Sequence, residues 1–154
     1  MKQGLILTVV SLFAIGVFAQ DAVTLRKKHF NLERTVAIQG YDPVAYFKQG
    51  KALKGSKQLS TSYDGVTYYF SSSENKELFV KSPKTYEPQY GGWCAYAMGN
   101  SGEKVEVDPG TFKISDGKLY LFYNKFFNNT LKSWNKDERE LHAKADVNWQ
   151  KIYH

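Results

Sequence analysis

Two Asp-Gly dipeptides place the strongest constraint on how this 154-residue chain can fold. Each separates two runs rich in β-branched and aromatic residues: Asp64-Gly65 lies between 59–63 and 66–70, and Asp116-Gly117 lies between 112–115 and 118–123. Asp-Gly is typical of a two-residue hairpin turn, because both central positions of that turn favour a positive φ. The sequence therefore predicts two antiparallel hairpins. The strand at 118–123 is apolar on both faces, so we expect it to lie centrally in its sheet.

Helix signals lie between the two hairpins and before the first. Asp42 is a good N-cap, Pro43 suits the first helical position, and Gly50 closes the short helix that they predict. The serines at 71–73 offer caps for a second helix, which carries Leu78 and Phe79 inward and ends before a proline at 83.

The end of the chain predicts two more helices. Asn124 caps the first in our interpretation, with Phe127, Leu131 and Trp134 spaced at i, i+4 and i+7. The last helix has one apolar stripe, made of Leu141, Ala145, Trp149 and Ile152. We also expect short strands at 36–38 and 104–107. This mixed order predicts an α+β fold, with a small antiparallel sheet from two hairpins, short helices, and C-terminal helices packed on it.

The amino terminus has the pattern of a secretory signal peptide. Lys2 supplies an early positive charge, an apolar run follows from Leu5 to Phe18, and small residues at 17 and 19 flank the predicted cleavage point after Ala19. The run is short for a bilayer crossing, so an uncleaved anchor is the weaker alternative. We expect a signal peptide at 1–19, a flexible lead-in at 20–35 and a single domain at 36–152. The predicted location is periplasmic or extracellular, with no transmembrane segment after cleavage.

The charge pattern argues against a nucleic-acid partner. The chain has a formal net charge of +6, but its basic residues are scattered rather than gathered in one block. A nucleic-acid surface needs a basic patch on one face, whereas scattered charge keeps an exported protein soluble. The single cysteine, Cys94, cannot form an internal disulfide, so stability has to come from a hydrophobic core.

Cys94 lies in the most distinctive stretch of the chain, at 88–99. A Gly91-Gly92 pair leads into it, as expected where the backbone needs a positive φ or passes close to another group. Two aromatic residues lie within two positions of the thiol, and Met98 follows four positions later. A lone thiol in an oxidising compartment is buried, bound to a metal or reactive.

Four segments together resemble the YHS-domain proteins, and more specifically their small exported bacterial members with one domain. They are Gly-Tyr-Asp-Pro-Val-Ala-Tyr-Phe at 40–47, Tyr-Asp-Gly-Val-Thr-Tyr-Tyr-Phe at 63–70, Pro-Gln-Tyr-Gly-Gly-Trp-Cys-Ala-Tyr at 88–96 and Ala-Lys-Ala-Asp-Val-Asn-Trp at 143–149. The resemblance spans Val36 to Ile152. It implies a link to heavy-metal handling, but metal-handling members carry Asp-Pro-Val-Cys-Gly-Met at the first motif. Here Ala45 and Phe47 replace that cysteine and methionine.

The sequence offers one candidate metal site. Cys94 and Met98 are spaced at i and i+4, and a thiolate with a thioether suits Cu(I). His142 is the histidine we would add as a third ligand. A copper or zinc ion is the cofactor that these residues suggest, although the sequence requires none. In the alternative interpretation, Cys94 is a small buried core residue and Met98 fills a gap.

Two further interpretations involve other side chains. A small-ligand pocket is one, with a candidate lining of Tyr41, Asp42, Tyr46, Tyr90, Trp93 and Tyr96; the alternative is an aromatic core in which Asp42 caps a helix. A thiol enzyme using Cys94, His142 and Asp146 is the weakest hypothesis, because no nucleophile signature is present. We therefore expect a binding module rather than an enzyme, with a ligand-free interaction domain as the alternative.

Overall fold

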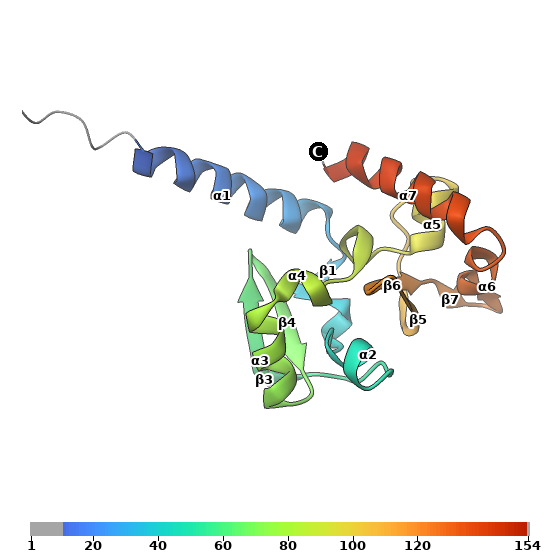
Figure 1. The fold of residues 1–154 in the computed structure, drawn as a ribbon, viewed down its shortest axis with the longest axis horizontal. Coiled ribbons are helices and arrows are strands. Elements are labelled where there is room, and N and C mark those ends of the chain that lie inside the picture. The colour runs from blue at the N-terminus through green and yellow to red at the C-terminus, as the bar shows by residue number, and fades with distance from the viewer. Residues whose placement is uncertain (1–10, 154) are drawn as a thin grey trace, which may run out of the picture.

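A four-stranded sheet, a separate hairpin and a layer of C-terminal helices make up the computed structural model, which describes residues 11–153 and the side chains from residue 20 onward (Figure 1). The elements are, in order, α1 (Ser11–His29), β1 (Leu32–Glu33), β2 (Val36–Ala37), η1 (Ile38–Gly40), α2 (Ala45–Lys48), β3 (Ser56–Tyr63), β4 (Val66–Phe70), α3 (Ser73–Lys81), α4 (Pro83–Tyr86), η2 (Gln89–Gly92), α5 (Ala95–Asn100), β5 (Asp108–Ser115), β6 (Lys118–Phe122), β7 (Asn124–Lys125), β8 (Asn128–Asn129), α6 (Thr130–Trp134) and α7 (Glu138–Tyr153). The α+β prediction is confirmed.

Both predicted hairpins form with the expected turn geometry. Asp64 and Gly65 have φ of 45° and 80°, and Asp116 and Gly117 have φ of 49° and 70°. The hairpins belong to different sheets, however: β3 and β4 lie in the sheet ordered β1-β2-β4-β3, and β5 pairs with β6 alone. The first sheet is also not wholly antiparallel, because β2 runs parallel to β4.

Strand β6 lies at the centre of the second half of the molecule. Its residues from Leu119 to Phe122 are all buried. One edge pairs with β5, and the other makes isolated bridges in which Leu119 meets Pro88 and Leu121 meets Cys94. The Cys94 segment therefore lies directly beside β6. The sequence predicted a central position for this strand; its sheet has only two strands, and isolated bridges take the place of a third.

Two predicted elements are wrong. Residues 104–107 form no strand; Val105 instead accepts a backbone hydrogen bond from the Cys94 N–H at 2.9 Å. The helix that we predicted from Asn124 is replaced by the β7–β8 hairpin, and α6 begins only at Thr130, where Asn129 caps it. The reason is local, because Phe126 and Phe127 have positive φ, which a right-handed helix does not accommodate.

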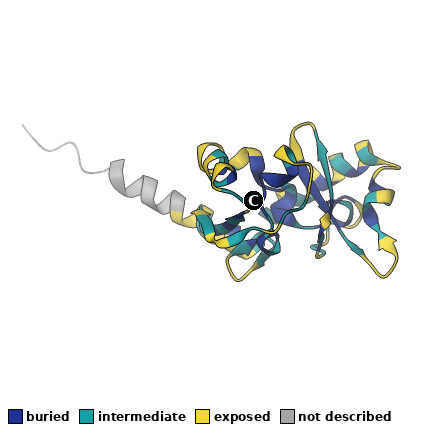
Figure 2. Cartoon of the chain, turned by 90° about the horizontal axis from the view of Figure 1, so that it is seen from below, coloured by how far each residue is buried: buried dark blue, intermediate teal, exposed yellow. Residues whose placement is uncertain are grey.

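The core has two hydrophobic clusters, and the buried residues gather inside the body formed by the elements after α1 (Figure 2). The larger cluster joins the first sheet, α3 and part of β6, and includes Cys94. The smaller one joins α5, α7 and the other face of β6, and includes Met98 and Trp134. Both clusters are rich in aromatic side chains, as the composition suggests.

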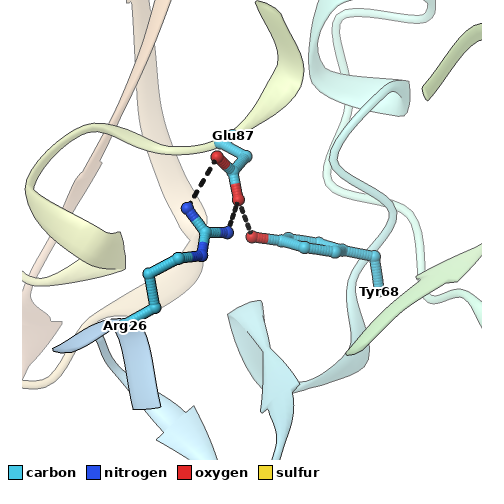
Figure 3. A network of polar contacts seen from close by, with 3 residues as sticks. All are labelled: Arg26, Tyr68 and Glu87. Carbon is cyan, nitrogen blue, oxygen red and sulfur yellow. Dashed lines mark hydrogen bonds and ion pairs between the residues drawn. The ribbon is translucent and has the colours of Figure 1, made fainter. Parts of the chain in front are cut away.

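The amino-terminal segment has more structure than the lead-in that the sequence suggests. Residues 1–10 of the predicted signal peptide lie outside the described residues, and α1 continues unbroken past Ala19 to His29. In the segment 20–35, the Arg26 side chain is buried in an ion pair with Glu87, and Glu87 also accepts the Tyr68 hydroxyl (Figure 3). Across residues 11–153, no helix has the length and apolar character required to cross a membrane.

Candidate functional site

The Asp42 carboxylate is a fully buried junction between three segments. Its Oδ1 accepts hydrogen bonds from the backbone N–H groups of Val44 (2.8 Å) and Ala45 (3.3 Å), so it caps the start of α2. Its Oδ2 accepts from the Ser71 N–H (2.8 Å), the Ser71 hydroxyl (2.6 Å) and the Asn75 amide (2.7 Å). Five donors converge on one carboxylate that is 0% exposed. This side chain joins α2 to the β4–α3 connection and offers no free face to a ligand.

Cys94 is positioned by a strained turn. In η2 the backbone has positive φ at Tyr90 (54°), Gly91 (60°) and Gly92 (86°), as the glycine pair predicts. A Cβ on Gly91 would lie only 2.8 Å from the Phe30 ring and 2.9 Å from the Trp149 ring. Cys94 follows this turn at the N-cap position of α5, and its carbonyl accepts a hydrogen bond from the Met98 N–H at 3.0 Å.

The Cys94 thiol is 0% exposed and has two hydrogen-bond partners. The Tyr123 N–H donates to the sulfur at 3.3 Å, and the Thr130 hydroxyl lies 3.4 Å away. The Thr130 hydroxyl donates its single hydrogen to the Tyr123 carbonyl at 2.9 Å. The thiol must therefore be the donor to Thr130. The sulfur both gives and receives one hydrogen bond, so it behaves as a satisfied core group.

A cavity of about 300 Å³ lies beside Cys94. Aromatic and aliphatic groups form part of its wall, and hydroxyl, amide and carboxylate groups form the rest: the lining is Cys94, Tyr96, Ala97, Asn100, Ser101, Glu103, Val105, Tyr123, Asn128 and Thr130. Tyr96 is the one residue of our predicted pocket that lines it. The other lining residues come from α5, the loop after it and the β6–α6 segment.

The three candidate metal ligands, Cys94, Met98 and His142, lie in different parts of the structure. Cys94 lines the cavity just described, whereas His142 lines another, and Met98 packs in the smaller core cluster. The partners of the His142 Nε2 are the Tyr120 hydroxyl at 2.9 Å and the Asp146 carboxylate at 3.7 Å. Among the described residues, no group of three or more histidine, cysteine, aspartate or glutamate side chains could hold a metal ion.

The remaining residues of the predicted pocket are mostly engaged with protein groups. The Tyr46 hydroxyl donates to the Pro109 carbonyl at 2.9 Å, and burial raises the Tyr46 pKa. The Tyr90 hydroxyl donates to Asp146 at 2.9 Å, and the Trp93 indole donates to the His29 carbonyl at 2.7 Å. Tyr41 lies under the Lys54 ammonium, 4.4 Å from the ring centre.

Comparison with protein families matches the chain to the YHS domain. The YHS domain model matches residues 44–90, from just before α2 to Tyr90 in η2. This chain contains a YHS domain. The YHS segment holds β3, β4, α3 and Glu87, while Asp42 lies two residues before it and Cys94 four residues after it. Comparison with curated proteins and with solved structures found no match.

Sequence reasoning missed a cavity outside the YHS segment. It measures about 420 Å³ and is lined by Ser115, Asp116, Tyr120, Trp134, Glu138, Arg139 and His142. Burial, followed by the charge of Asp146, raises the Tyr120 pKa to about 12, so this phenol stays protonated. The hydrogen bond from Lys113 is the main cause that lowers the Glu138 pKa. Glu138, Arg139 and His142 reach this cavity from α7, and Ser115 and Tyr120 reach it from β5 and β6, so only the folded chain brings the two walls together.

Proposed function

We propose that this protein is an exported binding module that holds a small organic ligand in the cavity beside Cys94. The observation that carries the proposal is the lining of that cavity. Tyr96, Tyr123 and Val105 offer apolar surface, and Asn100, Asn128 and Ser101 offer hydrogen-bonding groups at the rim. Small-ligand sites combine these two kinds of surface, and a volume of about 300 Å³ is at the lower end of their range.

A small organic ligand has more support than a copper or zinc ion. A soft metal needs the thiolate, whereas the Cys94 S–H donates to Thr130 and its sulfur accepts from Tyr123. Met98 and His142, the other candidate ligands, have partners elsewhere. We also propose that the module is not a thiol enzyme, because the described partners of the Cys94 sulfur include no imidazole that could act as its base.

Export rests on the pattern of the first 19 residues. A positive charge, a short apolar run and small residues before Gln20 are what a signal peptidase requires. Amino-terminal sequencing of the protein recovered outside the cytoplasm should begin at Gln20. A chain that retains Met1 would contradict this part of the proposal.

A blocked cavity tests the binding function. Asn100→Trp places an indole at the exposed rim of the cavity, and Ala143→Trp adds the same side chain to an exposed position of α7. Ligand-observed NMR with a set of small aromatic and hydroxylated fragments should give hits for the wild type and for Ala143→Trp. Those hits should be lost in Asn100→Trp. Equal binding by both variants would place the ligand elsewhere, and a wild type without hits would end the proposal.

The second candidate is a ligand-free structural domain, which the complete burial of Cys94 favours. Titration with Cu(I) and Zn(II), with Cys94→Ala as the control, separates metal binding at Cys94 from the small-ligand module and from the ligand-free domain. Near-zero stoichiometry in wild type and variant would remove the metal. If the fragment screen also fails and the native thiol reacts only at the rate of unfolding, the structural domain is the better description.

A further inference from the structure

The β7–β8 hairpin carries two aromatic side chains at its tip. The Phe126 side chain is 89% exposed, and the Phe127 side chain is fully exposed. The three other exposed large hydrophobic residues among the described side chains are 37–56% exposed, so these two rings stand furthest into solvent. Burial of a phenylalanine ring is favourable in free energy, so leaving two adjacent rings in solvent is unfavourable.

The backbone at this tip is also unfavourable for phenylalanine. Phe126 and Phe127 have φ of 52° and 63°, the left-handed region that both central positions of this turn require. The equivalent positions of the β3–β4 and β5–β6 hairpins hold Asp64-Gly65 and Asp116-Gly117, which adopt such angles easily. A bulky residue held at positive φ strains the backbone, and such strain is typical of functional sites. Of the described hairpins, this is the one that places two aromatic residues at positive φ in its turn.

The base of the hairpin is held firmly to the body. Asn124 pairs with Asn129, and its side-chain amide donates to the Thr111 hydroxyl at 2.9 Å. Thr130, which follows β8, donates through its N–H (3.0 Å) and its hydroxyl (2.9 Å) to the Tyr123 carbonyl. The two rings therefore project from a rigid support.

Lysines lie close to the tip along the chain. Between 117 and 136 the chain has four exposed lysines and no aspartate or glutamate: Lys118, Lys125, Lys132 and Lys136. Lys118 begins β6 at the β5–β6 turn, so the two lysines that matter for the tip are Lys125 and Lys132. Lys125 directly precedes the two rings, and Lys132 lies in α6, which directly follows the hairpin. Two apolar rings flanked by lysines match the interface of a membrane with anionic headgroups, where apolar groups insert and cations contact phosphate.

We propose that the Phe126–Phe127 tip inserts into the surface of membranes that carry anionic lipids. A protein partner fits less well, because two rings bury only about 300–500 Å², whereas a stable protein interface buries at least about 1,200 Å². The tip lies next to the cavity beside Cys94, because Asn128 of β8 lines that cavity, but neither ring is among the lining residues. Insertion would hold the protein at a membrane surface, although no helix within residues 11–153 could cross the membrane.

The test uses a variant that should fold better than the wild type. Phe126→Asn with Phe127→Gly installs the residues that this turn prefers, so its melting temperature should equal or exceed that of the wild type. The matched control is Val80→Ser, which removes an apolar side chain that is 56% exposed at another place. Each protein is purified in the form that its producing cell exports and is sedimented with vesicles of phosphatidylcholine, with and without 30% phosphatidylglycerol (roughly the anionic content that attracts basic segments).

We expect the wild type and Val80→Ser to sediment with anionic vesicles and the tip variant to bind at least about tenfold more weakly, since its apolar anchor is gone. Lys125→Ala with Lys132→Ala should weaken binding to anionic vesicles and leave the small binding to neutral vesicles unchanged. Equal sedimentation of the wild type and a stable tip variant would overturn the proposal. A wild type that does not sediment with anionic vesicles would also overturn the proposal and would favour a protein partner for the tip.

Discussion

Replacing Arg26 with alanine should cost this domain a large part of its stability. Arg26 comes from the end of α1, and its guanidinium forms a two-pronged ion pair with Glu87, with one arm at 3.2 Å (Figure 3). The two side chains are only 9% and 11% exposed. The guanidinium also lies over the Phe30 ring at 4.5 Å and over the Tyr63 ring at 5.1 Å.

The expected cost follows from what alanine leaves behind. Removing one partner of a buried ion pair typically costs about 3–5 kcal/mol, because the other charge stays buried without its partner. Glu87 keeps one hydrogen bond, from the Tyr68 hydroxyl. This remaining partner favours the lower limit, so we expect a loss of about 3 kcal/mol in the free energy of unfolding. In a domain of this size that corresponds to a fall of about 10 °C in melting temperature.

A double-mutant cycle in urea gives the measurement. Arg26→Ala, Glu87→Ala and the double variant should show a coupling of about 2 kcal/mol, since the residues share one network. Arg26→Lys is the control that keeps the charge but loses the planar fork, and its loss should be smaller. A coupling below about 0.5 kcal/mol would refute the reasoning, because two groups in direct buried contact should not behave additively.

Two further predictions concern other buried groups. Asp42→Asn should lower the free energy of unfolding by about 2–4 kcal/mol in urea, because the amide turns a donor toward groups that now donate to Asp42; a loss under about 1 kcal/mol would show that the five hydrogen bonds are not essential. Burial raises the Tyr120 pKa to about 12 from its ordinary 10.0, so its contribution to stability is complete below about pH 10 and is lost as the pH rises through about 12. Absorbance titration at high pH of wild type and Tyr120→Phe checks this, and a Tyr120 signal that titrates near pH 10 would contradict it.

Local signals in the sequence predicted the elements well where one or two residues decide the backbone. The Asp-Gly turns and the Asp42 cap of α2 are cases in which the side chain or φ of a short segment sets the conformation. The exception is Phe127, whose helical spacing to Leu131 and Trp134 indicated a helix. Trp134 is indeed buried, but Phe127 lies at a hairpin tip, where a positive φ outweighs the apolar spacing.

The surroundings of Cys94 needed the folded chain. The groups that meet its sulfur are 29 and 36 residues away in sequence, and they reach it because β6 lies beside the Cys94 segment. The Arg26–Glu87 pair joins residues 61 apart, and nothing near Arg26 in the sequence indicates that it is buried.

The sequence by itself determined the two Asp-Gly turns, the Asp42 cap of α2, the YHS motifs and the presence of one unpaired thiol, because these depend on short segments and residue identity. Only the tertiary structure decided that Asp42 is enclosed, that Cys94 and His142 line different cavities, and that two phenylalanines are left in solvent. The physical reason is that burial and partner choice come from packing between distant segments, which local preference does not encode.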